Sequence, residues 1–154
     1  MEHEKLISII NTANKYCYCV NILDKKANEK IDEYIQVVFP LITFSSLTCE
    51  MYLKALVYKN TGNLSKGHNL RKLYNNIAAT EQQELKKKFN EWIGDGGSFD
   101  EEIDRLSEIF VQWRYLYEQG WVVPEDHRGV RLGSLVMIMN ILHDICNEYK
   151  NNVK

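Results

Sequence analysis

The sequence predicts an all-α protein, an up-and-down helical bundle of about five to six helices. Two observations predict this class. Apolar residues recur at three- and four-residue steps over long segments, and only two prolines and eight glycines punctuate the chain. With 154 residues, 45% of them hydrophobic, the chain is long enough to bury one sizeable core. We therefore expect a single helical domain over residues 1–154.

The first two helices are expected in the N-terminal 60 residues. A stripe that includes Leu6, Ile10 and Val20 predicts a helix over 4–27. Residues 31–39 form either a helix or an irregular lead-in, and we favour a helix with a kink near Pro40. The nearly continuous apolar pattern of 41–59 predicts a central helix packed on several sides.

Capping residues mark the remaining helices. Asn69 is placed to cap a short helix, Thr80 opens the next one, and Ser98 precedes three acidic residues that suit a helix N-terminus. Gly120 is placed to end the helix that follows Ser98. The predicted helices are 70–78, 80–93, 99–119 and 130–150.

The overall charge is nearly balanced, with 19 Lys and Arg against 21 Asp and Glu. The net charge of the chain therefore does not attract a polyanion or a membrane surface, and RNA binding would need a local basic patch. No apolar run approaches the ~18–20 residues of a membrane span, and residues 1–5 are too charged to begin a secretory signal. These features predict a cytoplasmic protein with no membrane partner.

The four cysteines, Cys17, Cys19, Cys49 and Cys146, lie within apolar helical patterns and form no C-x-x-C pair. We interpret them as buried thiols. No histidine is spaced with another ligand as a metal motif requires, so we expect no metal and no cofactor.

Charged residues in the apolar helices are the first candidates for a functional site. Glu50 and Lys54 are four residues apart, as are Arg114 and Glu118, so each pair can meet on one helix face. A buried Glu50 needs a second cation, and Arg114 is the natural candidate. The four residues then form a structural ion-pair network.

The alternative is a binding role for the same residues. Arg114 would contact a phosphate or carboxylate, with the two glutamates orienting its guanidinium group. Tyr115 and Tyr117 could stack on a base, although aromatic residues at helical spacing more often belong to the core.

Two further features carry open interpretations. His68, just before the predicted cap Asn69, can cap backbone amides, bind an anion or act as an acid or base, and we favour capping. The run of lysines at 86–88, with Lys66, Arg71 and Lys72 nearby in sequence, is either a nucleic-acid patch or, as we favour, a solvated helix face.

Three segments together carry a family resemblance. The segments Cys49–Leu56, Gly67–Leu70 and Phe110–Glu118 occur in an order that resembles the HEPN family of small helical-bundle proteins. The resemblance covers roughly residues 40–120. It matches the positions Glu50, Lys54, His68, Arg114, Tyr117 and Glu118.

The resemblance implies homodimerisation and a toxin–antitoxin, phage-defence or RNA-processing setting, with RNA or a nucleotidyltransferase as partner. Catalytic relatives are metal-independent endoribonucleases with a histidine four to six residues after an arginine. Arg114 has no such histidine, since His127 is thirteen residues away, and the other arginines lack one too. Two hypotheses follow: a non-catalytic module that dimerises and engages RNA or a partner protein, or a ribonuclease in which Arg114 acts with His68 or His127.

Overall fold

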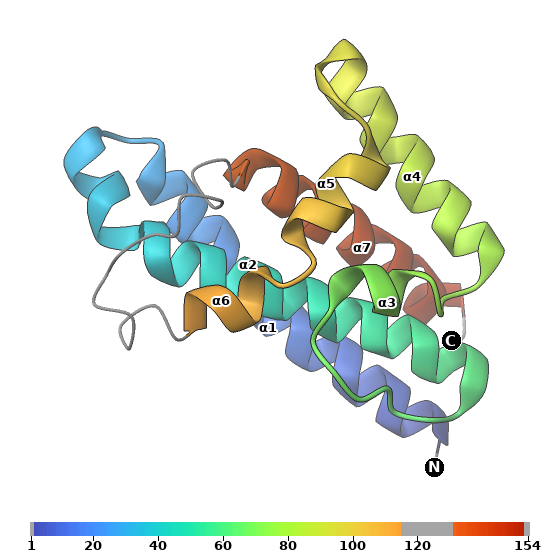
Figure 1. Cartoon of the computed structure of the whole chain (residues 1–154). Coiled ribbons are helices and arrows are strands. Elements are labelled where there is room, and N and C mark those ends of the chain that lie inside the picture. Colours follow the sequence, from blue (N-terminus) through green and yellow to red (C-terminus); the bar gives the residue numbers. More distant parts are fainter. Residues whose placement is uncertain (1, 115–130, 153–154) are drawn as a thin grey trace.

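The computed structural model describes residues 2–114 and 131–152, and within them the chain is helical with no strand (Figure 1). This confirms the predicted all-α class. The elements are α1 (Glu2–Ala27), α2 (Ile31–Thr61), α3 (Leu70–Tyr74), α4 (Ala79–Ile93), a 3₁₀ turn η1 (Gly94–Gly96), α5 (Phe99–Leu106), α6 (Ile109–Arg114) and α7 (Leu132–Asn152).

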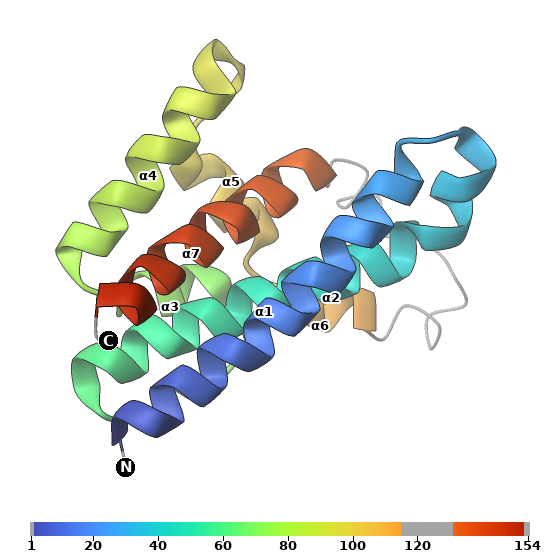
Figure 2. The ribbon, with the colours of Figure 1, turned by 180° about the vertical axis from the view of Figure 1, so that it is seen from behind.

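The long helices α1, α2 and α7 form the centre of the bundle. Figures 1 and 2 show α1 and α2 as an antiparallel hairpin with α7 beside it. Helix α4 packs against α7, and α5 packs against α3 and α4. Fully buried side chains from each of the three, such as Ile10, Leu53 and Leu142, meet in one core. Each such side chain contributes roughly 1.5–3 kcal/mol by leaving water.

Hydrogen bonds join α1 to α2 and α7 at the edge of this apolar centre, through the buried Tyr52 and the half-buried Asn14 and Asn147. The Tyr52 hydroxyl donates to Asn14 Oδ1 at 2.7 Å, and the Asn14 amide donates to Asn147 Oδ1 at 2.9 Å. Buried polar groups are stable only when they are hydrogen-bonded, so this chain of bonds restricts how the helices can align.

Helix α2 continues through Pro40, as the apolar pattern of 31–39 predicted. Pro40 has no N–H for the helix ladder, and Figures 1 and 2 show the first turns of α2 at an angle to the rest. The helix ends at Gly62, whose φ of 69° is left-handed and whose N–H donates to Tyr58 O at 2.8 Å.

The expectation that no segment reaches the length of a membrane span is wrong by length and composition, because the continuous helix α2 meets both criteria. The central helix of a bundle meets the same two criteria. Here α2 packs against α1, α3, α6 and α7 and carries the charged pair Glu50 and Lys54.

The predicted helix over 70–78 is wrong in length, because α3 ends at Tyr74. The Gln82 side chain, on α4, donates to the carbonyl oxygens of Asn75 and Ile77. These bonds satisfy carbonyls that a longer helix would have used, so the chain turns at residues 75–78 before α4.

The predicted helix over 99–119 is also wrong, since residues 107–108 separate α5 from α6. The Ser107 carbonyl accepts a hydrogen bond from the Leu70 N–H at 3.1 Å, and the Ser107 hydroxyl donates to Ile103 O at 2.6 Å. The break thereby joins the start of α3 to the α5–α6 junction.

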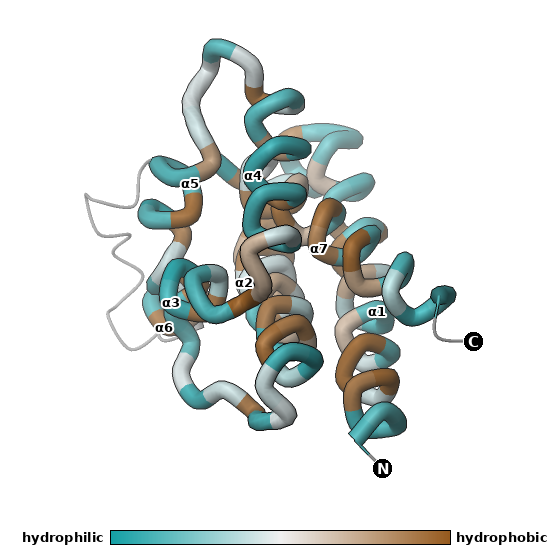
Figure 3. Tube along the Cα trace, turned by 90° about the vertical axis from the view of Figure 1, so that its right-hand side faces the viewer, coloured by the Kyte–Doolittle hydropathy of each residue, from teal (hydrophilic) through white to brown (hydrophobic). Residues whose placement is uncertain are grey.

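Helix α4 lies on the outside of the bundle. It buries Leu85 and Phe89, while most of its surface is hydrophilic (Figure 3). The Phe89 ring packs edge-on against Phe99 at 5.7 Å, which fixes α4 to α5. The basic stretch of α4 therefore faces solvent.

Candidate functional site

Glu50 is a buried carboxylate in the middle of α2. Its Oε1 accepts a hydrogen bond from Lys54 Nζ at 2.7 Å, one helical turn away. A charge taken out of water alone costs several kcal/mol, so a buried carboxylate needs such partners. The four-residue spacing of these residues predicted that they could meet.

The second partner of Glu50 is His68, which reaches α2 from the loop before α3. His68 Nδ1 lies 3.0 Å from both carboxylate oxygens of Glu50. An ionised carboxylate can only accept, so Nδ1 carries the proton and donates. Nε2 is then the ring nitrogen left to meet a ligand, and 47% of the His68 side chain is exposed.

Our favoured capping role for His68 is wrong, because the next residue performs it. Asn69 Oδ1 accepts from the Lys72 N–H at 2.9 Å and so caps α3. The shorter Asn side chain can fold back onto its own helix, whereas the His68 ring extends to Glu50. The loop reaches this position through Gly67, whose φ of 97° is left-handed.

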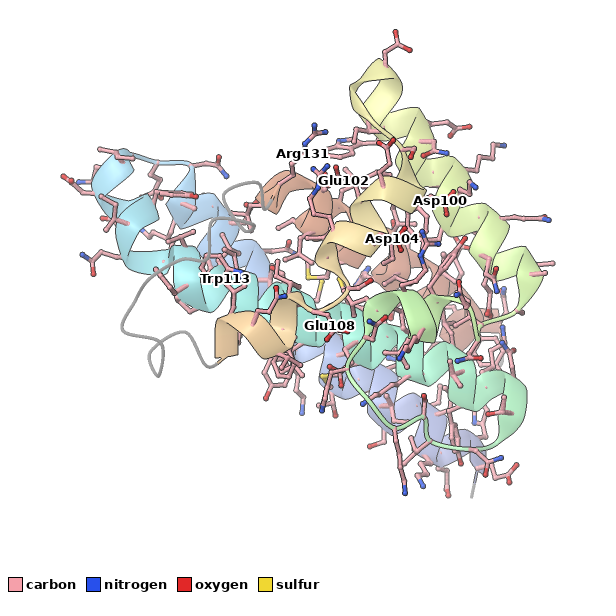
Figure 4. All side chains as sticks on the ribbon, viewed as in Figure 1. Asp100, Glu102, Asp104, Glu108, Trp113 and Arg131 are labelled. Carbon is pink, nitrogen blue, oxygen red and sulfur yellow. The ribbon has the colours of Figure 1, made fainter. Side chains whose placement is uncertain are left out.

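Helix α6 supports the histidine from the other side. The rings of His68 and Phe110 lie 5.7 Å apart between centroids, and Phe110 is buried. The Asn69 amide also donates to Glu108 Oε1, and Figure 4 shows Glu108 between α3 and α6. The first, second and third sequence segments of the family resemblance are thus joined at His68.

A cleft of about 430 Å³ opens beside this cluster. Two lysines of its lining, Lys66 and Lys72, form no ion pair with another described residue. The one acidic residue of the lining, Glu108, is bonded to Asn69. The two lysines outnumber this one carboxylate, so the lining is locally cationic. The sequence placed both lysines near the run 86–88 in a possible nucleic-acid patch, but it did not place them beside His68.

The predicted arginine part of the site lies largely outside the described residues. Arg114 is the last residue of α6, but its side chain is not among those the structure describes. Tyr117, Glu118 and His127 also lie outside the described residues. The expected pairings of Arg114 with Glu50 and Glu118 therefore stay predictions. Just before Arg114, the Trp113 ring lies 5.1 Å from Phe39 of α2 (Figure 4).

The lysine run of α4 is matched by acids. Lys88 Nζ lies 2.6 Å from Glu84, Lys87 Nζ lies 3.9 Å from Glu91, and Lys86 donates to Asp100. These pairs reduce the local positive charge, and they favour the solvated helix face over a nucleic-acid patch.

An ion-pair group on the outer side of α5 involves the same Asp100. Arg71 donates to Asp100 at 2.9 Å and to Asp104 at 2.6 Å, and Figure 4 shows both acids on α5, facing α3 and α4. Hydrogen bonds from Lys86 and Arg71 hold the pKa of Asp100 below its ordinary value. This group joins α3, α4 and α5.

A buried glutamate on α5 holds two arginines. Glu102 Oε1 accepts from Arg105 at 3.1 Å and lies 3.6 Å from Arg131, just before α7 (Figure 4). Arg131 also donates to the Gly96 carbonyl at 2.7 Å. These contacts fix the start of α7 against α5 and η1.

Three cysteines are buried as expected, but Cys19 is exposed, so that part of the prediction is wrong. Cys19 is two residues from Cys17, and this spacing places it on another side of α1. Burial raises the pKa of the Cys17, Cys49 and Cys146 thiols. Within the described parts of the chain, no three potential ligands are grouped to hold a metal ion.

Comparison with known proteins gives one match. The family model for the HEPN domain matches residues 41–128, which is more than half of the 154-residue chain. No curated protein and no solved structure matches the chain. The matched range contains Glu50, Lys54, His68 and the cleft beside them. The chain belongs to the HEPN domain family.

Proposed function

We propose that this HEPN domain is a non-catalytic module that binds RNA through the cleft beside His68. One observation carries the proposal. A buried carboxylate, Glu50, holds His68 at the edge of a cleft whose lysines lack acidic partners among the described residues.

The chemistry of the cleft suits a phosphate backbone. Lys66 and Lys72 provide ammonium groups, which bind phosphate as point charges. His68 Nε2 can donate to a phosphate oxygen when the ring carries both protons. Because the net charge of the chain is −2, RNA contact depends on such a local cationic site.

The non-catalytic part of the proposal rests on the sequence. The arginine and histidine that catalytic relatives place four to six residues apart are not found at Arg114 or at any other arginine of the chain. An RNA bound at the cleft would therefore be held without cleavage.

A ribonuclease is the second candidate, favoured by the same histidine. A carboxylate on Nδ1 with Nε2 toward the ligand is the arrangement that orients histidine for proton transfer. In this case His68 would remove the proton from a ribose 2′-hydroxyl, whose oxygen would attack the adjacent phosphorus. The P–O5′ bond would break, the 5′-oxygen would take a proton from water, and a lysine or Arg114 would stabilise the phosphate.

Family membership supports two further parts of the proposal. We propose that the domain acts as a homodimer in a toxin–antitoxin or phage-defence setting, with an RNA or a nucleotidyltransferase-type protein as partner. Sedimentation of the purified chain tests the first part, and a mass corresponding to one chain would contradict it.

A binding and cleavage assay separates the two candidate functions. A labelled single-stranded RNA is titrated with wild type, with Lys66→Ala/Lys72→Ala and with His68→Ala, in a metal-free buffer at several salt concentrations. Lys87→Ala/Lys88→Ala is the matched control, since it also removes two lysines but from acid-paired positions on α4.

We expect wild type and the Lys87→Ala/Lys88→Ala control to bind RNA equally. The cleft variant, Lys66→Ala/Lys72→Ala, should bind more weakly, and the slope of log K against log salt concentration should be smaller by about two. Intact RNA then supports the non-catalytic module. Cleavage that His68→Ala abolishes, with binding retained, supports the ribonuclease. Equal binding by the cleft variant and the control contradicts both.

A further inference from the structure

A second cavity, of about 430 Å³, lies on a part of the surface away from the cleft beside His68. The two cavities share no lining residue. It opens where the start of α7 passes the tip of the α1–α2 hairpin and the end of α4. In both Figures 1 and 2 this end of α7 lies between the hairpin and α4 with α5. We call this cavity the α7 groove.

The walls of the α7 groove are aromatic. Trp92 of α4 and Tyr34 of α2 line it, and their side chains are 47% and 38% exposed. Between them, Val136 and Met137 of α7 supply an aliphatic floor. Exposed aromatic rings around an apolar floor are typical of a surface that binds a ligand or partner.

The Trp92 ring lies against the first turn of α7, at Gly133. A Cβ atom at Gly133 would lie 3.8 Å from Trp92 Cη2, so the indole ring edge lies over the first turn of α7. The other side of Trp92 is supported by Phe89, at 5.5 Å between ring centroids. The ring is therefore fixed by packing and still half exposed.

The α7 groove has one charged lining residue, Asp24 of α1. Asp24 is half-buried and forms no ion pair with another described residue. Its nearest partner is the neutral Asn28 amide, 3.5 Å from Oδ1. Burial raises the pKa of this carboxyl group, and the Asn28 hydrogen bond offsets only part of that rise.

We propose that the α7 groove binds an alkylammonium group carried on an apolar chain. The ammonium group would meet the carboxylate of Asp24 beside the Tyr34 ring, and the apolar chain would lie over Val136 and Met137 toward Trp92. A carboxylate next to an aromatic face attracts organic cations through charge and the ring quadrupole together. We take a free amine as the occupant, because a cavity of about 430 Å³ has the size of a small-molecule site. A lysine of a partner protein is the competing outcome of the test.

The test uses n-hexylammonium as the probe and 1-hexanol as its uncharged counterpart, with the full chain followed by NMR. We expect hexylammonium to shift the signals of Asp24, Tyr34, Trp92 and Gly133, and hexanol to bind at least about tenfold more weakly. Equal binding of the two probes, or shifts confined to other surfaces, would overturn the proposal. This mapping uses wild type and does not depend on a variant that folds.

Two variants with matched controls test the residues. Asp24→Asn and Trp92→Leu are each expected to weaken hexylammonium binding about tenfold. Asp32→Asn, at an exposed acid near the hairpin tip, and Tyr18→Leu, at an exposed aromatic residue, should leave it unchanged. If Asp24→Asn, folded by circular dichroism, binds like wild type, the proposal is wrong.

A pair of peptides separates the two sources of the ammonium group. One is a helical peptide of Leu and Ala with a single central Lys, and the other has norleucine in place of Lys. Tighter binding of hexylammonium than of the Lys peptide supports a free amine. Tighter binding of the Lys peptide would overturn the free amine as the occupant in favour of a lysine of a partner protein. Equal binding of the two peptides would contradict recognition of a lysine.

Discussion

His68 Nδ1 lies 3.0 Å from both carboxylate oxygens of Glu50, although the two residues are eighteen positions apart and His68 belongs to a loop. The loop is thereby fixed to the centre of α2. Because Lys54 binds the same carboxylate at 2.7 Å, one buried acid holds both a side chain of its own helix and the loop histidine.

Replacement of Glu50 should therefore destabilise the domain. Glu50→Gln keeps the side-chain volume but loses the charge. Its amide nitrogen is a donor, so it cannot accept the hydrogen bonds that Lys54 and His68 donate to the carboxylate. We expect a loss of about 1–3 kcal/mol in the free energy of unfolding, measured in urea. Asp32→Asn at an exposed acid of the same helix is the control, and an equal, negligible effect of both would contradict the role of Glu50.

The cap of α3 offers a second test. Asn69→Ala removes both the cap on Lys72 N–H and the bond to Glu108, so we expect a loss of about 1 kcal/mol or more. Amide hydrogen exchange in α3 should rise most. Asn63→Ala in the preceding loop is the control, because Asn63 lies outside α3.

The ion pairs of Asp100 should make stability depend on pH. Lys86 and then Arg71 lower the pKa of Asp100 from its ordinary value of 3.8. The stability that they add is present above that value and is lost as the pH falls through the lower folded-state pKa. Asp100→Asn should thus be less stable than wild type at neutral pH, and the difference should shrink in acid. A stability difference between the two proteins that does not change with pH would show that it does not come from the ion pairs of Asp100.

The pH dependence of stability that arises from Asp24 should be opposite to that from Asp100. Burial raises its pKa, so its contribution favours the folded state at low pH and is lost as the pH rises through the folded-state pKa. Without a ligand, Asp24→Asn should be at least as stable as wild type at neutral pH. Thermal unfolding at several pH values measures this, and a marked loss of stability at neutral pH would show an unrecognised cation partner.

The cysteines should differ in reactivity. Cys19 is exposed, whereas Cys17, Cys49 and Cys146 are buried and their raised pKa values keep the thiols neutral. A thiol reagent should label one cysteine quickly in the folded protein and all four in denaturant. Cys19→Ser should abolish the fast phase, and a fast phase that survives in this variant would contradict the assignment.

Local spacing predicted the features that arise within one helix. The apolar stripes gave the long helices, and the four-residue step from Glu50 to Lys54 gave their contact. The cap at Asn69 followed from its residue type just before an apolar segment.

Features that depend on distant residues were missed. The break at Ser107 requires the Leu70 N–H, 37 positions away, to bind the Ser107 carbonyl, and no local signal marks it. The pairing of His68 with Glu50 depends in the same way on how a loop returns to α2. Arg114 was the expected partner because helical charges are easier to recognise in sequence than a loop histidine.

The bonds between Tyr52, Asn14 and Asn147 have a consequence for evolution of the domain. Three apolar residues of similar size would fill the space with less desolvation, but they would accept several alignments of the helices. The polar side chains pair in one alignment, so a substitution at any one position removes a hydrogen bond from another. We therefore expect these three positions to change together or not at all among sequences that keep this arrangement.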